Sequence, residues 1–177
     1  MIADSTILIT FAKINRLDIL VKLYNKIYIT EAIYDEIITQ GTLINATDSL
    51  LLKDYFDQGK INLEKLKDKN IILSENLRKL NPPLGKGESE AISLAIQRNE
   101  KLILLDESYA RRVAEMSDLR CIGSLRILTN SFDENIIDEK EIDEIIKQMI
   151  NNKFRIGADI LNDFWDIFEQ IKKNKKK

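Results

Sequence analysis

The sequence predicts an α/β fold built on a parallel sheet, and three observations support this prediction. Residues 101–105 form a short, nearly continuous apolar run, which is typical of a parallel strand that is covered on both faces. The preceding segment, from about Glu88, carries apolar residues at the spacing of an amphipathic helix. The chain also opens with a short apolar run that ends at an acid, Asp4, just as residues 101–105 end at Asp106.

The elements before residue 41 follow from the same patterns. Asp4 and the two polar residues after it are suited to cap a helix. Residues 16–23 predict a short amphipathic helix, and residues 26–29 predict a second strand. Thr30 is placed to cap a helix over residues 31–40, and the apolar stripe of that helix makes Glu36 border its inward face.

The rest of the chain alternates between weaker and stronger signals. Residues 41–80 predict an insertion, with a helix at 48–56 and short apolar runs at 61–63 and 71–73. After Asp106, the pattern predicts a helix at 108–116, a strand at 119–122 and a helix that begins after Gly123. Residues 133–177 predict a helical extension with a break at 153–157 and a basic, solvated tail.

Composition restricts the classes of protein that this chain can be. Its 177 residues and 44% hydrophobic content suit one globular domain of ordinary size. Lys and Arg total 27 against 29 Asp and Glu, so any basic groove for nucleic acid must be local. The absence of histidine excludes histidine-dependent triads and histidine metal sites, and the single cysteine excludes an internal disulfide. No basic leader and no membrane-length apolar run are present, so we expect a soluble cytoplasmic protein.

Four acids share one predicted position, at the carboxyl end of a strand or on an inward helical face near that end: Asp4, Glu36, Glu88 and Asp106. Ligands bind at that edge of open α/β sheets. Asp4 and Glu88, each taken alone, are explained better by a role at a helix N-terminus. Together the four acids need a positive charge among them, and Mg²⁺ or Mn²⁺ suits a site made only of carboxylates.

The helix after residue 85 carries two candidate acids, Glu88 and Glu90, and helical geometry distinguishes them. Glu88 stands at the head of the apolar stripe that faces the sheet, so its side chain is expected to point inward. Glu90 begins a mixed line of residues and is expected on the flank or the solvent side.

At this point the sequence resembles the PIN domain family, specifically its prokaryotic toxin-like subgroup. The resemblance covers about residues 1–130 and is carried by four motifs in order: ADSTILITFAKINRLDIL, YITEAIYDEI, GESEAISLA and LILLDESYARRVAE. It implies a three-layer α/β/α sandwich with a mostly parallel central sheet, followed here by the C-terminal helical extension. It also implies Mg²⁺- or Mn²⁺-dependent hydrolysis of phosphodiester bonds in single-stranded RNA.

The resemblance assigns roles to individual residues, and the mechanism it implies has Asp4, Glu88 and Asp106 hold the metal ion while Glu36 assists through water. Asp4, Glu36 and Asp106 match acids of the family pattern, whereas the third acid matches Glu90 by register and Glu88 by the inward-face argument. Many members carry their last acids one or two positions further on, where this chain has Glu107 and Ser108. Ser5 matches a small polar position of the family and is expected either to orient the first acid or to hold a metal-bound water. Arg111 is expected near the edge, together with Arg112 and Arg126, either to contact substrate phosphates or to form surface ion pairs.

Several functions and partners remain open from the sequence. We expect a metal-dependent endoribonuclease, with a small antitoxin protein or a second copy of the chain as further partners. The alternative is a catalytically inactive PIN-like module that binds RNA or a partner protein. A phosphatase of the haloacid type is disfavoured because Thr6 stands where that class has a second aspartate.

Overall fold

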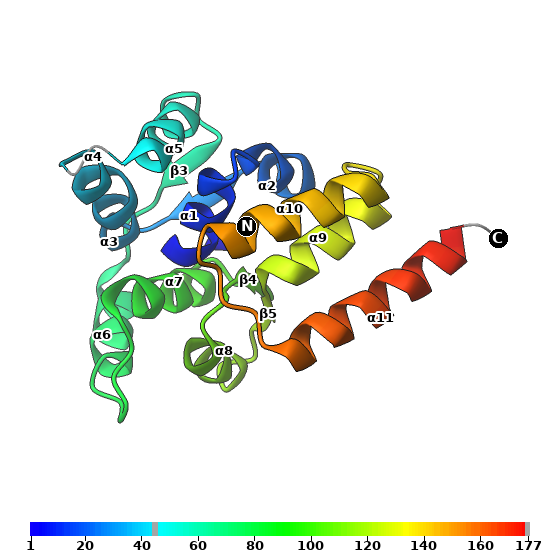
Figure 1. Cartoon of the computed structure of the whole chain (residues 1–177). Coiled ribbons are helices and arrows are strands. Elements are labelled where there is room, and N and C mark those ends of the chain that lie inside the picture. The colour runs from blue at the N-terminus through cyan, green and yellow to red at the C-terminus, as the bar shows by residue number, and fades with distance from the viewer. Residues whose placement is uncertain (44–45, 176–177) are drawn as a thin grey trace.

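The computed structural model describes residues 1–43 and 46–175 and contains one five-stranded sheet, in the order β3-β2-β1-β4-β5 (Figure 1). The strands are β1 (Ile2–Ala3), β2 (Ile27–Ile29), β3 (Ile61–Leu63), β4 (Leu102–Leu104) and β5 (Arg120–Ile122). All four neighbouring pairs are parallel. The predicted parallel α/β fold is therefore confirmed.

Helices flank this sheet, as the sandwich architecture requires. They are α1 (Ser5–Lys13), α2 (Leu17–Tyr24), α3 (Glu31–Tyr34), η1 (Asp35–Gln40), α4 (Gly41–Leu43), α5 (Thr47–Asp57), α6 (Asp68–Leu77), α7 (Lys86–Gln97), α8 (Ser108–Glu115), α9 (Ser124–Asp133), α10 (Glu139–Asn151) and α11 (Ala158–Lys175). Helix α7 packs against β1 and β4 and against its neighbours α3, α6 and α8, whereas α1 packs against α2, α5 and η1. The central strands are completely covered, and this explains their continuous apolar sequences.

The segment 41–80, which the sequence predicts as an insertion, contributes to the central sheet. It supplies β3, which pairs with β2 at the edge of the sheet, together with α5 and α6. The sequence pattern that would predict β3 is weak because an edge strand needs few apolar residues. Only Ile61 of β3 is fully buried. The apolar run at 71–73 lies within α6, where Ile71 and Ile72 are exposed. Residues 44 and 45 of this segment lie outside the described residues.

The predicted helix at 31–40 changes character in its middle. It begins as α3 and continues from Asp35 as η1, which is a π-helix. Such wide turns are rare and often occur at functional sites. Glu36 lies in this segment.

The C-terminal extension packs onto the domain as two helices. Phe164 and Phe168 of α11 are 4% and 1% exposed, and the rings of Phe132 on α9 and Phe168 lie 4.7 Å apart. At the far end of α11, Lys172 pairs with Glu139 of α10, and Lys175 donates to the Phe132 carbonyl. The described part of the basic tail is therefore held by contacts rather than only solvated. Lys176 and Lys177 lie outside the described residues.

Candidate active site

Asp4 and Asp106 leave the sheet side by side. Asp4 follows β1 and Asp106 lies two residues beyond β4, and these two central strands pair in register Ala3 to Leu104. The Asp4 backbone N–H donates to the Leu104 carbonyl at 3.1 Å, which extends the ladder to the acid itself. Both carboxylates therefore stand at the carboxyl edge of the sheet.

Asp4 is a buried carboxylate that is only half satisfied. Its side chain is the N-cap of α1, because Oδ1 accepts the Ile7 N–H at 2.9 Å, and the residue is only 1% exposed. Its other oxygen, Oδ2, is buried and has no hydrogen-bond partner among the described residues. Burial, together with the negative charges of Asp106 and Glu88, raises the pKa of Asp4 to about 8, although the Ile7 hydrogen bond opposes this shift. Asp4 is a helix cap, but capping accounts for only one of its oxygens.

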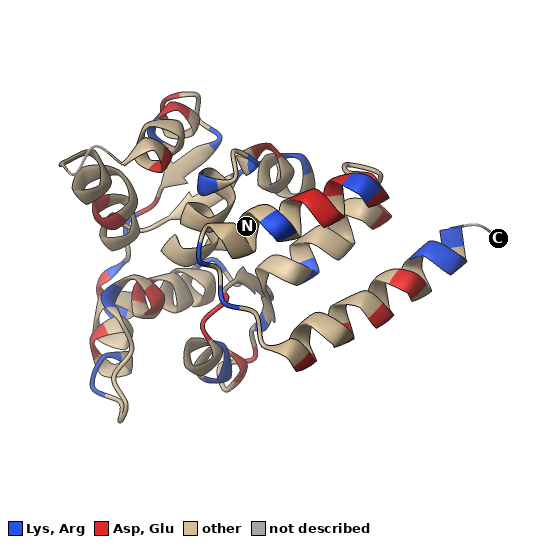
Figure 2. Cartoon of the chain, in the orientation of Figure 1, with Lys and Arg blue, Asp and Glu red and all other residues tan. Residues whose placement is uncertain are grey.

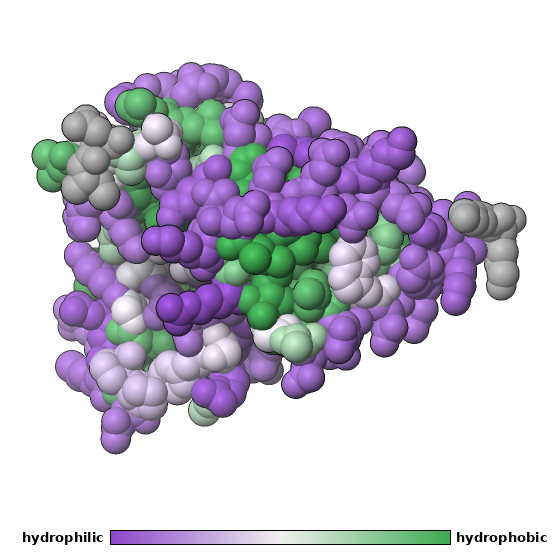
Figure 3. All heavy atoms as spheres, viewed as in Figure 1, coloured by the Kyte–Doolittle hydropathy of each residue, from purple (hydrophilic) through white to green (hydrophobic). Residues whose placement is uncertain are grey.

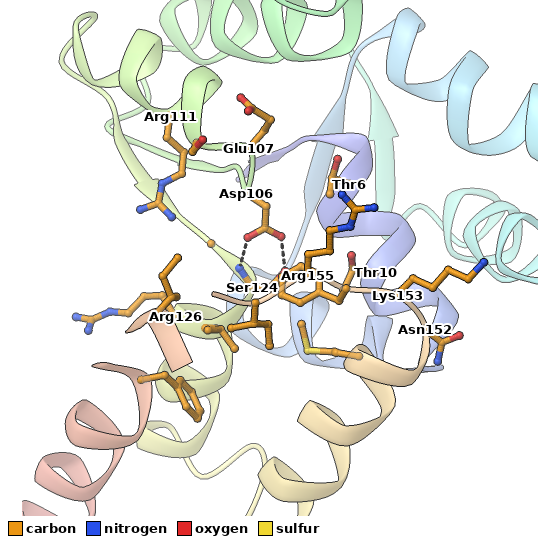
Figure 4. A pocket seen from close by; sticks show the side chains of 18 of the residues that line it. Thr6, Thr10, Asp106, Glu107, Arg111, Ser124, Arg126, Asn152, Lys153 and Arg155 are labelled. Carbon is orange, nitrogen blue, oxygen red and sulfur yellow. Dashed lines mark hydrogen bonds between the residues drawn. The ribbon is translucent and has the colours of Figure 1, made fainter. Parts of the chain in front are cut away.

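Asp106 is held from the next strand along the sheet. The pairing of Leu104 with Ile122 continues past both strand ends, so that Asp106 meets Ser124. Its Oδ1 accepts the Ser124 N–H at 2.8 Å and its Oδ2 accepts the Ser124 hydroxyl at 2.5 Å (Figure 4). Burial raises the pKa of Asp106, whereas the Ser124 hydrogen bonds and the positive charge of Arg111 oppose that shift.

Gly123 makes room for this arrangement. A Cβ atom at position 123 would lie 2.9 Å from Asp106 Oδ1 and 3.0 Å from Arg111 Nη1. Because these distances are shorter than normal contacts, only glycine allows the carboxylate and the guanidinium to approach the start of α9 so closely. Arg111 thus lies beside Asp106, as the sequence predicts for a supporting residue.

The two glutamates on α7 have different surroundings. Glu88 is half-buried and accepts the Gly85 N–H at 2.9 Å, which closes the first turn of α7. Burial and the nearby charges of Glu107 and Glu36 raise the pKa of Glu88. Glu90, whose side chain is 14% exposed, instead accepts the Ala32 N–H at 3.2 Å on the flank that faces α3. Of these two glutamates, only Glu88 adds to the charge that raises the pKa of Asp4.

Glu36, Ser5 and Glu107 complete the border of this edge. The Glu36 Oε2 and Ser5 Oγ atoms lie 3.4 Å and 4.0 Å from the point where a Cβ on Gly87 would stand. Glu36 is exposed, whereas Ser5 is buried beside Asp4. Glu107 is exposed and caps α8 by accepting the Ala110 N–H at 2.6 Å. We call the four acids Asp4, Glu36, Glu88 and Asp106 the acidic cluster.

A sequence profile of the PIN domain matches residues 1–170. The chain belongs to the PIN domain family. The match extends through most of α11, so most of the helical extension lies within it. PIN domains are typically nucleases and usually bind divalent metal ions. No curated protein sequence matched the chain.

The acidic cluster of this PIN domain has the chemistry of a site for a hard cation. Within residues 1–43 and 46–175, no three acidic or cysteine side chains already form a group that would hold a metal ion. The donor set nevertheless fits Mg²⁺ or Mn²⁺, because it offers only oxygen atoms and the buried Asp4 Oδ2 has no hydrogen-bond partner in the described part of the chain. The oxygens of Asp106 and Glu88 accept hydrogen bonds, but each carboxylate has about four lone-pair positions.

Two features of this edge are not predicted from the sequence. From the sequence, Ser124 is only the first residue of the helix predicted after Gly123, yet it donates hydrogen bonds to both oxygens of Asp106. The available signal was the strand register, since Gly123 and Ser124 follow β5 as Asp106 follows β4. Residues 152–156, which connect α10 to α11, also reach this edge, and no local sequence pattern in them indicates this.

Proposed function

We propose that this PIN domain is a Mg²⁺- or Mn²⁺-dependent endoribonuclease that hydrolyses phosphodiester bonds in single-stranded RNA. The observation that best supports the proposal is the buried Oδ2 of Asp4 in the acidic cluster, which has no hydrogen-bond partner among the residues that the structure describes. A buried carboxylate is costly without a counter-charge, and a helix cap needs only Oδ1. The choice of RNA as substrate rests on the family resemblance.

Asp4, Glu88 and Asp106 are the residues that would hold the cation. When bound, such a cation supplies a water of lowered pKa and neutralises charge on the phosphate. The protein contributes orientation, because each acid is fixed by a backbone N–H: Ile7 for Asp4, Gly85 for Glu88 and Ser124 for Asp106. A site held in this way needs little rearrangement when substrate binds.

The residues around these three ligands act on substrate and solvent. Glu36 is exposed at the rim, and its role is to accept a hydrogen bond from the water that attacks the phosphate. The Arg111 guanidinium beside Asp106 is placed to attract a substrate phosphate.

Cleavage of labelled single-stranded RNA with Mn²⁺ and with EDTA tests this proposal. The parent protein should cleave only with Mn²⁺, and Asp4→Asn and Glu88→Gln should lose at least a hundredfold in kcat/KM. Glu90→Gln is the matched control from the same helix. It should keep most of the activity, because the glutamine Oε1 can still accept the Ala32 N–H. Equal cleavage with Mn²⁺ and EDTA would contradict a metal-dependent mechanism.

The second candidate is an inactive PIN-like module that binds RNA or a protein. It is favoured by Asp106, both of whose oxygens are already engaged by Ser124. In that case the parent would bind RNA without cleaving it, and Asp4→Asn would bind equally well. As partners we propose a small antitoxin protein or a second copy of the chain. Co-expression with the adjacent reading frame and size-exclusion chromatography test these two partners.

A further inference from the structure

A cavity of about 1120 Å³ opens beside the acidic cluster (Figure 4). On one side it is lined by Thr6, Asp106, Arg111 and Ser124. On the other side it is lined by residues 152–156, which connect α10 to α11, and by the first turns of α11. We call residues 152–156 the connector. The C-terminal extension therefore forms one wall of a cavity that contains an acid of the proposed active site.

The cavity lining has an excess of positive charge, because five basic residues stand against three acidic ones, Asp106, Glu107 and Asp163. Five basic residues line it, and none of them forms an ion pair within the part of the chain that the structure describes: Lys13, Arg111, Arg126, Lys153 and Arg155. Figure 2 shows the basic connector passing the acidic segment that follows β4. In Figure 4, Arg155 extends over the cavity on the side of Thr6. Arg112, which was expected near this edge, instead lies over the Tyr109 ring.

Besides these charges and several small polar residues, the lining has a continuous apolar part. Phe154 and Ile156 of the connector continue into Ile160, Phe164 and Ile167 of α11. Figure 3 shows this apolar hollow where α9, α10 and α11 meet, surrounded by hydrophilic residues. Ile160 is 60% exposed there. An aromatic and apolar surface beside unpaired cations suits a ligand with flat apolar faces and a negatively charged backbone.

We propose that this cavity binds the nucleotides of single-stranded RNA that flank the cleaved phosphate. Arg155 and Lys153 contact backbone phosphates, and Phe154 stacks on a base. The cavity volume exceeds the range of about 300 to 1,000 Å³ that is usual for small-molecule pockets, so it accommodates more than one nucleotide. The assignment rests on the proposed function for the identity of the strand.

The charges favour RNA over a docked protein helix as the occupant. An apolar helix would cover the five basic side chains without neutralising them, and covering unpaired charges is costly. An RNA strand places phosphates against the same side chains. Recruitment of the connector also gives the C-terminal extension a role in substrate binding beyond packing.

Fluorescence anisotropy with a labelled single-stranded RNA tests the proposal in the full chain. The Asp4→Asn background with EDTA prevents cleavage during the measurement. Arg155→Ala combined with Lys153→Ala should weaken binding and reduce the slope of log K against log salt by about 1.4, or about 0.7 for each lost phosphate contact. Both side chains belong to exposed residues, so the fold should be retained.

Phe154→Leu keeps the apolar volume and removes the aromatic face. It should weaken RNA binding by roughly tenfold without changing the salt slope, because stacking does not depend on counterion release. Lys140→Ala is the matched control, since Lys140 is exposed on α10 and lies about 13 Å along the helix from Met149. This variant should bind like the background protein.

The outcomes separate this inference from the proposed activity. Loss of affinity and salt slope in the Arg155 and Lys153 variant supports the inference, even if the parent protein shows no cleavage. Unchanged affinity and slope would overturn it, even if the parent cleaves RNA with Mn²⁺. In that second case, the apolar part of the cavity would instead be assigned to docking of a protein.

Discussion

Replacing Asp4 with asparagine should stabilise the metal-free protein, by an amount that increases with pH. The pKa of Asp4 is about 8 in the folded protein and about 3.9 in an unfolded chain. Between these values the folded state holds a proton that the unfolded state has released. The free energy of unfolding therefore falls as pH rises, by about 1.4 kcal/mol per pH unit. Below the unfolded-state pKa, Asp4 causes no loss in the free energy of unfolding. Above about pH 8, where Asp4 is ionised in both states, this free energy falls no further.

The size of the effect follows from that slope. At pH 7 the free energy of unfolding of the parent is about 4 kcal/mol lower because of Asp4, and the Asp4→Asn variant avoids this loss. The asparagine still caps α1 through Oδ1, but its buried Nδ2 lacks an acceptor, which costs about 1 to 3 kcal/mol. A net gain of about 1 to 3 kcal/mol remains at pH 7, and little or none remains at pH 5.

Urea denaturation in EDTA at pH 5, 6 and 7 measures this difference. Asp138→Asn is a matched control, because Asp138 caps α10 in the same way but is exposed. This control should show no gain that grows with pH. If the difference between the parent and Asp4→Asn stays constant from pH 5 to pH 7, the electrostatic reasoning about the acidic cluster is wrong.

Two further predictions concern the residues around the cluster. Gly123→Ala should displace Asp106, because the new Cβ would lie 2.9 Å from its Oδ1, and RNA cleavage should fall more than tenfold in the assay with Mn²⁺. Gly157→Ala is its control, since the nearest atom there is 3.9 Å away, and equal activity of both variants would refute this reasoning. Truncation before residue 159 should lower the melting temperature in a thermal scan by many degrees, because it uncovers Phe132 and removes two buried phenylalanines. An unchanged melting temperature would show that α11 is a detachable element.

Much of the central fold could be predicted because buried parallel strands leave a direct sequence signal. The runs at 1–3, 26–29, 101–105 and 119–122 correspond to β1, β2, β4 and β5. The positions of Asp4 and Asp106 followed, since parallel strands end at one edge of the sheet. The helical stripe likewise predicted that Glu88 faces inward, and Glu88 contributes to the raised pKa of Asp4.

The remaining features depend on contacts between distant parts of the chain. Strand β3 is recognisable only as a partner of β2, because its own sequence is short and partly polar. The π-helix at Asp35 has no clear local sequence signature. The hydrogen bonds between Asp106 and Ser124 depend on strand register, and the connector reaches the site through the packing of α10 and α11.

Calorimetric titration with Mn²⁺ at pH 7 tests most directly whether the acidic cluster is a metal site. The parent should bind Mn²⁺ and release protons, because the raised pKa of Asp4 leaves it protonated before the cation binds. Asp4→Asn should bind much more weakly without that proton release, and Glu90→Gln should bind like the parent. Equal Mn²⁺ affinity in the parent and Asp4→Asn, or no binding by the parent, would contradict the assignment of a metal-dependent active site.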